Sequence, residues 1–255
     1  MNSSRPIIVS LSSFGATAVR RHGQAWFVHL CKQAGADGVE VRGELLHGLA
    51  GELEQIRAAV AETALYCVYS SPQMLWTAQG RFDEEALRLG LDDAAAIGAS
   101  VLKMSIGGFN DSSIDTLDRL AAALGSTDIV LMIENDQTPG AGTVHALKRF
   151  FAALDDADIK LDMTFDVGNW HWTGECPLLA AQSFAGRVRY VHCKGVQRQV
   201  DRWVAVPLTD SAAPWRAVLR GLPTSVPHAI EYPLVGNDLT TITRDAIAQL
   251  RALET

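Results

Sequence analysis

The chain has 255 residues, of which 48% are hydrophobic and 20% are charged, and this composition excludes an intrinsically disordered protein. Its formal net charge of -7 at pH 7 disfavours a nucleic-acid partner, because proteins that bind nucleic acid carry a basic surface. The four cysteines form no CxxC pair, and neither the apolar core of a signal peptide nor a membrane span is visible. We therefore expect a cytoplasmic protein with reduced thiols and no membrane partner.

Eight short apolar runs alternate with longer amphipathic stretches. The runs predict strands at Ile7–Ser12, Gly38–Arg42, Ala64–Ser70, Val101–Ser105, Ile129–Glu134, Leu161–Asp166, Val188–His192 and His228–Glu231. Strands that alternate with helices indicate a parallel sheet, and eight repeats are the number found in a closed (β/α)₈ barrel. The expected fold is one α/β domain, a single barrel over residues 1–255.

Helical periodicity is clearest in three of the intervening stretches, Glu52–Ala61, Phe82–Ile97 and Leu239–Leu253. Asp83 is expected to cap the second of these helices, and a residue from Asp111 to Ser113 the helix that follows. An open, doubly wound sheet is disfavoured, because no glycine-rich phosphate turn follows the first strand. The least regular segment is Gly195–Pro214, which we expect to be a functional loop.

Four consecutive predicted strands end in side chains that commonly bind metals. They are Glu134, Asp166, His192 and Glu231. Taken alone, each acidic residue could equally cap a helix or pair with a cation, and the histidine could be a core residue. The carboxyl ends of parallel strands meet on one face of a barrel, so together they can surround one ion. Since three carboxylates repel one another, we expect a bound cation to offset that repulsion.

The predicted ligand set is mostly oxygen with one nitrogen. Such a set suits Mn²⁺, Mg²⁺ or Co²⁺, with Zn²⁺ as an alternative. Nearby polar residues extend the candidate site. Lys194 either binds an anionic or hydroxyl group of a substrate or forms a salt bridge at the rim, and Lys103 points into the barrel mouth or outward. Glu40 shares a strand face with Arg42, so the two either pair inside the barrel and shape the pocket or are structural.

Aromatic and amide side chains near the strand ends are further candidates. Phe14, Trp170 and Trp172 could line the apolar face of a sugar, although aromatic residues at such positions are as often part of the core. Asn135 and Gln137 are candidates for hydrogen bonds that orient the ligands.

The segments IEND, FDVGN, VHCKG and AIEYP, together with GVEVRGEL, YSSP and LKMSIGGF, resemble the xylose isomerase-like TIM-barrel superfamily over nearly the whole chain. This superfamily includes sugar and sugar-phosphate isomerases and epimerases, dehydroshikimate dehydratases and family 2 apurinic endonucleases. The resemblance implies that Glu134, Asp166, His192 and Glu231 bind one divalent metal, with Mn²⁺ the first choice. It also implies that Glu134 and Glu231 act as a catalytic acid/base pair, moving a proton next to a carbonyl.

Two departures from the superfamily pattern leave the substrate open. Many epimerases carry histidine where this chain has Asn169, with His171 two residues further on, and an acidic residue where this chain has Gly195. Asn169 and His171 are therefore candidates for substrate contacts.

The leading hypothesis is a metal-dependent isomerase or epimerase of a small sugar-like molecule, and a dehydratase that uses the same residues is the alternative. An apurinic endonuclease is disfavoured, because the YSSP and KMSIGG segments lack the additional histidines that such enzymes use. A sugar-binding barrel without turnover is the fourth reading. A homo-oligomer is left open.

Overall fold

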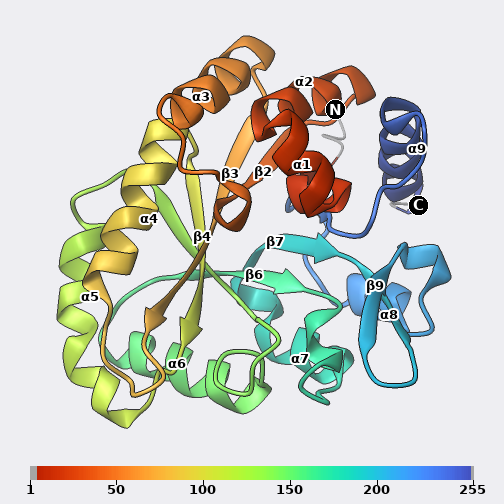
Figure 1. The fold of residues 1–255 in the computed structure, drawn as a ribbon. Coiled ribbons are helices and arrows are strands. Elements are labelled where there is room, and N and C mark those ends of the chain that lie inside the picture. Colours follow the sequence, from red (N-terminus) through yellow and green to blue (C-terminus); the bar gives the residue numbers. More distant parts are fainter. Residues whose placement is uncertain (1–4, 254–255) are drawn as a thin grey trace.

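Eight parallel strands close into a barrel in the order β1-β10-β7-β6-β5-β4-β3-β2 (Figure 1). Their bounds are Ile7–Ser10 for β1, Gly38–Arg42 for β2, Tyr66–Trp76 for β3, Val101–Gly107 for β4, Val130–Glu134 for β5, Asp162–Asp166 for β6, Val188–Cys193 for β7 and His228–Ile230 for β10. The computed structural model describes residues 5–253, so residues 1–4 and 254–255 of the expected domain lie outside it. The closed sheet confirms the predicted (β/α)₈ barrel.

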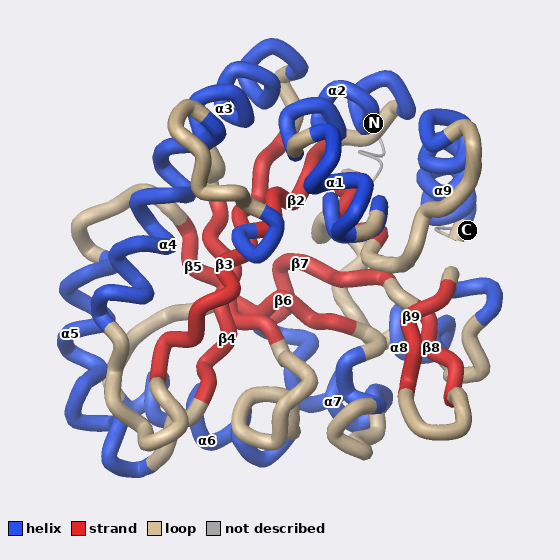
Figure 2. The backbone as a smooth tube through the Cα atoms, in the orientation of Figure 1, coloured by secondary structure: helices blue, strands red, loops and turns tan. Residues whose placement is uncertain are grey.

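Helices surround the barrel (Figure 2). They are α1 Ala16–His22, α2 Gln24–Ala34, α3 Glu52–Thr63, α4 Glu84–Ile97, α5 Leu117–Leu124, α6 Val144–Asp156, α7 Pro177–Phe184, α8 Trp215–Arg220 and α9 Leu239–Ala252. Asp83 caps α4 as predicted, since its side chain accepts a hydrogen bond from the backbone N–H of Ala86. The cap predicted within 111–113 is wrong, because Asn110 caps a 3₁₀ helix at Asp111–Thr116 that precedes α5.

Three strands differ from the prediction by two residues or more, and one of them is β4, which extends two residues further, to Gly107. The chain after β1 turns into a 3₁₀ helix at Leu11–Phe14, so the first strand is shorter than expected. In contrast, β3 extends to Trp76, because its second half, beyond an irregularity after Ser70, pairs again with β4. The strand ends that carry the candidate ligands match the prediction to within one residue, with Glu231 directly after β10.

The segment 195–214 is more regular than predicted. It contains an antiparallel hairpin of β8 Gly195–Arg198 and β9 Trp203–Val206, which lies outside the barrel beside β7 (Figure 2). The two runs hold valine and tryptophan on either side of a polar turn, a pattern typical of hairpins. Interpreting the whole segment as irregular was therefore wrong.

The barrel interior is layered. One cluster of buried side chains fills its lower part, formed by Ile8, Val68, Val101, Met132, Tyr190 and Ala229. Successive residues of a strand point to opposite faces, so the residues two places further along also point inward. Those residues are Ser10, Ser70, Lys103, Glu134, His192 and Glu231. The same strand period that builds an apolar floor thus places a polar layer above it, toward the carboxyl ends of the strands.

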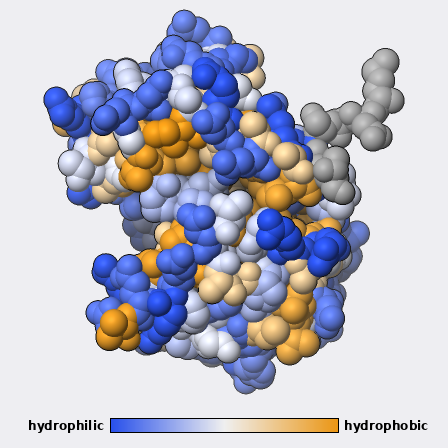
Figure 3. Space-filling model, turned by 90° about the vertical axis from the view of Figure 1, so that its right-hand side faces the viewer, coloured by the Kyte–Doolittle hydropathy of each residue, from blue (hydrophilic) through white to orange (hydrophobic). Residues whose placement is uncertain are grey.

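Outside the barrel, the face that carries α8, α9 and the β8–β9 hairpin shows hydrophobic residues in separate patches among hydrophilic ones (Figure 3). Within residues 5–253, no helix combines the length and the apolarity that crossing a membrane requires.

His228 at the start of β10 gives the fold a testable pH dependence. It is fully enclosed, and its Nδ1 lies 3.0 Å from the carbonyl oxygen of Val226. Burial, together with the positive charge of Arg5, lowers the pKa of His228 to about 3. Below pH 6.5 the unfolded chain therefore takes up a proton that the folded chain refuses, so this histidine lowers the stability as the pH falls.

We expect His228→Gln to remove this contribution. The free energy of unfolding of the variant should gain on that of the wild type by about 2 kcal/mol between pH 7 and pH 5. Urea unfolding at several pH values measures the difference. If the difference in the free energy of unfolding between variant and wild type is the same at pH 7 and pH 5, the assigned pKa of His228 is contradicted.

Candidate functional site

Four side chains converge at the carboxyl ends of β5, β6, β7 and β10. The Nδ1 atom of His192 lies 3.0 Å from Glu134 Oε1, 3.0 Å from Glu231 Oε2 and 3.6 Å from Asp166 Oδ2. One ligand atom from each residue lies within 4.8 Å of the others. The four residues predicted from the strand ends are therefore brought together.

Their exposure divides the four into two inner and two outer groups. The side chains of Asp166 and His192 are completely buried, whereas those of Glu134 and Glu231 are 17% and 11% exposed. The two outer groups also come from the two outer strands of the arc β10-β7-β6-β5. Glu134 and Glu231 thus flank the cluster and are the pair that a molecule entering the barrel mouth would meet.

Glu40 on β2 fixes the orientation of the imidazole. Its Oε2 lies 2.7 Å from His192 Nε2 and also accepts a hydrogen bond of 3.1 Å from the Tyr190 hydroxyl. Because Nε2 is committed to this carboxylate, Nδ1 is the nitrogen that faces the three other carboxylates. A histidine whose second nitrogen donates to a carboxylate is typical of metal sites, where that contact fixes the tautomer and the ring. Glu40, predicted to pair with Arg42 and shape the pocket or to be structural, does pair with Arg42 and also touches the candidate ligand His192.

The backbone after β6 holds Asp166 in place. Its Oδ1 accepts hydrogen bonds from the backbone N–H groups of Gly168 and Asn169, at 2.8 and 2.9 Å. The Asn135 side chain bridges both backbone polar groups of Asp166. Asn169 donates to the Asn135 carbonyl at 2.8 Å and accepts from Gln137. Asn135 thus supports the candidate ligand directly, and Asn169 and Gln137 support it through Asn135.

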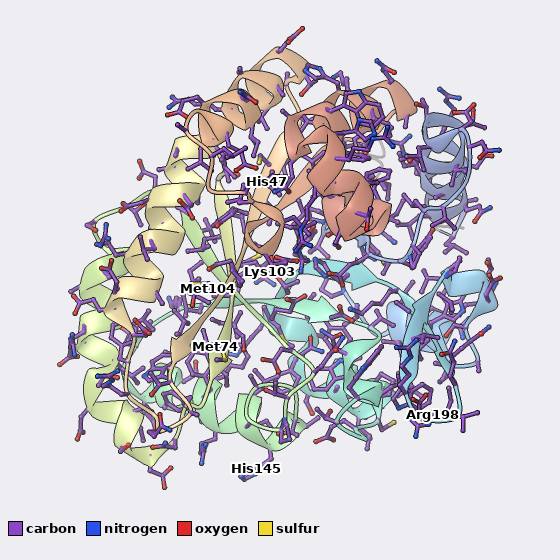
Figure 4. The ribbon with its side chains drawn as sticks, viewed as in Figure 1. His47, Met74, Lys103, Met104, His145 and Arg198 are labelled. Atoms are coloured by element: carbon purple, nitrogen blue, oxygen red, sulfur yellow. The ribbon has the colours of Figure 1, made fainter. Side chains whose placement is uncertain are left out.

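Three cationic side chains accompany the carboxylates. Lys103 Nζ lies 2.8 Å from Glu134 Oε2 and 3.4 Å from Glu40 Oε1, and it points into the barrel centre (Figure 4). Arg42 Nη1 lies 2.7 Å from both Glu40 Oε1 and Glu231 Oε1. The Lys194 ammonium lies 2.8 Å from Asp166 and 2.8 Å from Glu231. Protein cations, which the sequence analysis did not consider for this purpose, therefore also offset the repulsion between the carboxylates.

These contacts shift the acidities in different directions. Burial raises the pKa of Glu134, but the charges of Lys103 and His192 outweigh it and hold that pKa below its usual value. Burial also opposes ionisation of Glu231, and Lys194 with His192 lowers its pKa well below the usual range. For Asp166 burial prevails over Lys194, so its pKa is raised. Glu134 and Glu231 are therefore held as carboxylates at neutral pH.

The donor set fits a divalent metal ion. Within residues 5–253, neither His192 Nδ1 nor Asp166 Oδ2 meets a partner with hydrogen-bond geometry, although charged groups lie close to both. A buried polar atom without a hydrogen bond is costly, and a metal ion accepts such lone pairs. Glu134, Asp166, His192 and Glu231 could therefore hold one cation, with one nitrogen and three carboxylate ligands.

Two of the aromatic candidates do not face the site. Trp170 is completely buried and packs against Phe165 and Phe184, and Phe14 is buried and stacks on Phe27 at 4.5 Å between centroids. Both rings lie on short 3₁₀ helices that follow β1 and β6, and both are part of the core. Their prediction as sugar contacts is therefore wrong.

The remaining candidates, His171 and Trp172, follow β6 and lie near the hairpin and Lys194. His171 is half-buried, with its ring 5.1 Å from that of Trp203 on the hairpin. The Trp172 ring centroid lies 6.0 Å from Lys194 Nζ. Sequence reasoning missed Trp203, because the hairpin that carries it was interpreted as irregular. It also missed Tyr190, although the strand period places it on the same face as His192.

The described fold is similar to solved structures of low sequence identity. A xylose isomerase domain containing protein from Salmonella typhimurium LT2 matches with a TM-score of 0.73 and 16% identity, over 99% of each chain. The 3-keto-D-glucoside 4-epimerase from E. coli matches with a TM-score of 0.65 and 18% identity, over 97% of this chain and 99% of the other.

A probable 3-DHS dehydratase from Bacillus anthracis, involved in petrobactin synthesis, matches with a TM-score of 0.69 and 12% identity, over 96% of this chain and 98% of the other. At these identities the likeness shows the fold alone. No functionally curated protein matches the sequence. The sequence profile described as a xylose isomerase-like TIM barrel matches residues 28–253, most of the chain. The chain therefore belongs to the xylose isomerase-like TIM-barrel family.

Proposed function

We propose that this protein is a divalent-metal-dependent isomerase or epimerase of a sugar, a sugar phosphate or a related ketose. The observation that carries the proposal is the meeting of three carboxylates around His192 Nδ1, which has no hydrogen bond within residues 5–253, at the mouth of the barrel. The fold shared with a 3-keto-D-glucoside 4-epimerase supports the same class of reaction. Mn²⁺ is the metal we propose, because the ligands are mainly oxygen with one imidazole.

The proposed chemistry is proton transfer at a carbon next to a carbonyl. A divalent ion, when bound, would polarise that carbonyl and make the neighbouring C–H bond more acidic. Glu134 and Glu231 are the two partly exposed carboxylates, and their lowered pKa values keep them ionised at neutral pH. One of them removes the proton and later releases it to solvent, and the other returns a proton that it has first taken up from solvent. Return on the opposite face inverts the carbon, and return to the neighbouring carbon moves the carbonyl.

The surrounding cations hold the proposed acid/base pair in position. Lys103 binds one oxygen of Glu134, and Arg42 binds one oxygen of Glu231, so each carboxylate has limited freedom to rotate. Neither cation touches the oxygen that faces His192 Nδ1, at 3.0 Å in both cases. One oxygen of each glutamate is thus committed to orientation, and the other is directed to the centre of the site.

Metal binding can be tested through stability. At a Mn²⁺ concentration one hundred times the Kd, a site present only in the folded state stabilises it by about 2.7 kcal/mol. We expect the melting temperature of the wild type to rise by roughly 5–10 °C with Mn²⁺ relative to a chelator. Asp166→Asn and His192→Ala should abolish this rise. An equal melting temperature of the wild type with and without metal would argue strongly against the site.

Proton transfer is tested with Glu231→Gln and Glu134→Gln, which keep a ligand oxygen but remove the carboxylate. With Mn²⁺ in D₂O, we expect the wild type to introduce deuterium into one member of a panel of ketohexoses and 3-ketoglycosides. NMR measures the rate at which deuterium is incorporated. Each variant should lose at least about 100-fold in rate, the range attributed to a positioned acid or base. Asp201→Asn at the turn of the hairpin is the matched control. Exchange at the wild-type rate in both variants would contradict the assigned roles.

The hydrogen bond between Glu40 and His192 has its own test. We expect Glu40→Gln to weaken Mn²⁺ binding about 10- to 100-fold, as is typical when a group that orients a metal-bound histidine is changed. Glu44→Gln is the matched control, because Glu44 is exposed and pairs with Arg42 Nε, whereas Glu40 pairs with Arg42 Nη1. Isothermal titration measures both affinities. Equal affinity in Glu40→Gln and the wild type would show that the contact does not orient a ligand.

A dehydratase is the second candidate, supported by the fold shared with a probable 3-DHS dehydratase. It would use the same removal of a proton next to a carbonyl but would then expel a hydroxyl group. Incubation with 3-dehydroshikimate and the ketose panel separates the two reactions. A conjugated product with ultraviolet absorbance indicates the lyase, and an isomer of unchanged mass indicates the isomerase or epimerase.

A further inference from the structure

Lys194 differs from the other two cations of the site in the oxygen atoms that it contacts. Its ammonium lies 2.8 Å from Asp166 Oδ2 and 2.8 Å from Glu231 Oε2. These two oxygens are the ones that approach His192 Nδ1, at 3.6 and 3.0 Å. Lys194 therefore occupies the inner side of the cluster.

Lys103 and Arg42 instead bind the carboxylate oxygens that face away from His192 Nδ1, which we call the outer oxygens; the oxygens that face Nδ1 are the inner oxygens. Lys103 contacts Glu134 Oε2, while Oε1 of that residue faces His192 Nδ1. Arg42 contacts Glu231 Oε1, while Oε2 faces the same nitrogen. Both cations can remain in place when the inner oxygens serve another partner.

A metal ion and the Lys194 ammonium cannot share the inner oxygens without strong repulsion. Metal–oxygen bonds of the expected ions are about 2.0–2.2 Å, and ammonium–carboxylate contacts are about 2.7–2.9 Å. An ammonium at its present distance from the two oxygens would then lie within a few ångströms of a divalent charge, in a buried site where screening is weak. One of the two cations has to leave.

On this basis we propose that Lys194 is an internal counter-ion of the metal site, which fills the cluster when no metal is bound and which a metal ion must displace. The proposal rests on the proposed metal-binding function. It assigns Lys194 a role as a positioning residue that sets the metal affinity.

The surroundings of Lys194 suit an ammonium inside the cluster and an ammonium displaced from it. Its side chain lies flat against Gly168, where an added Cβ would come within 2.8 Å of Lys194 Cγ and 3.2 Å of Cε. The backbone that follows Asp166 thus packs along the aliphatic part of the Lys194 side chain. The Trp172 ring, with its centroid 6.0 Å from Nζ, offers a displaced ammonium a cation–π contact. Displacement would carry the ammonium from the metal position toward this aromatic ring beyond the cluster.

The test compares Mn²⁺ binding by the metal-free full-length wild type, Lys194→Met and Lys194→Arg, with free Mn²⁺ measured by electron paramagnetic resonance. We expect Lys194→Met to bind Mn²⁺ at least about 10-fold more tightly than the wild type, and Lys194→Arg to show no gain. Without metal, Lys194→Met should melt at a lower temperature, because the carboxylates lose a counter-ion.

Lys103→Met is the matched control, since it removes a buried cation that contacts only outer oxygens. It should not tighten Mn²⁺ binding. Lys103→Gln serves in its place if that variant does not fold, and Lys194→Gln likewise replaces Lys194→Met. Equal tightening by the Lys103 variant would overturn the proposal, because general loss of positive charge would then explain the effect.

The outcomes separate this proposal from the proposed function. If the wild type binds Mn²⁺ and Lys194→Met binds it equally or more weakly, the counter-ion proposal is overturned and the metal site stands. Binding by Lys194→Met but not by the wild type supports the counter-ion proposal and overturns metal dependence in the native protein. Absence of Mn²⁺ binding in both proteins overturns both proposals.

Discussion

The contact between Glu40 and His192 is the constraint on which the rest of the site depends. Both side chains are completely buried and lie 2.7 Å apart, so neither can exchange its partner for water. The contact commits Nε2 and leaves Nδ1 directed at the three carboxylates at the opposite end of the imidazole. If the ring rotated, the nitrogen that holds the cluster together would be replaced by a carbon, and the three carboxylates would face one another directly.

The burial of four carboxylates, Glu40 among them, explains where the cations of the site lie. Burying four carboxylates in one barrel is strongly unfavourable unless each is paired, because desolvation penalises the charged form. Arg42 and Lys103 pair with the outer oxygens, and Arg42 joins Glu40 on β2 to Glu231 after β10, the two strands that flank β1. The chain can therefore assemble the cluster before any metal arrives. On the proposals above, metal binding would replace one internal cation, and the metal affinity would depend on how firmly that cation is held.

The sequence was sufficient to predict the barrel and the four converging residues, since both follow from the alternation of strands and the parallel arrangement of their ends. The same strand period could have identified Tyr190, which lies two residues before His192. It could not identify which oxygen each cation selects, because that depends on side-chain rotamers across the barrel. Nor could it separate Trp170 from Trp172, since the direction of the chain after β6 decides that the first ring packs on Phe184 and the second approaches Lys194.

The division between inner and outer groups has a consequence for the reaction. Asp166 and His192 are enclosed and held by fixed neighbours, so they can bind an ion without changing position. Glu134 and Glu231 are partly open, so they can also meet a substrate. The contacts of Lys103 and Arg42 lie on one oxygen of each glutamate and leave the other oxygen directed at the cluster. On the counter-ion proposal, Lys194 competes for the Glu231 oxygen that faces His192 Nδ1, and its removal from the cluster would admit the metal. Metal loading would then exchange one cation for another at the same oxygen of Glu231.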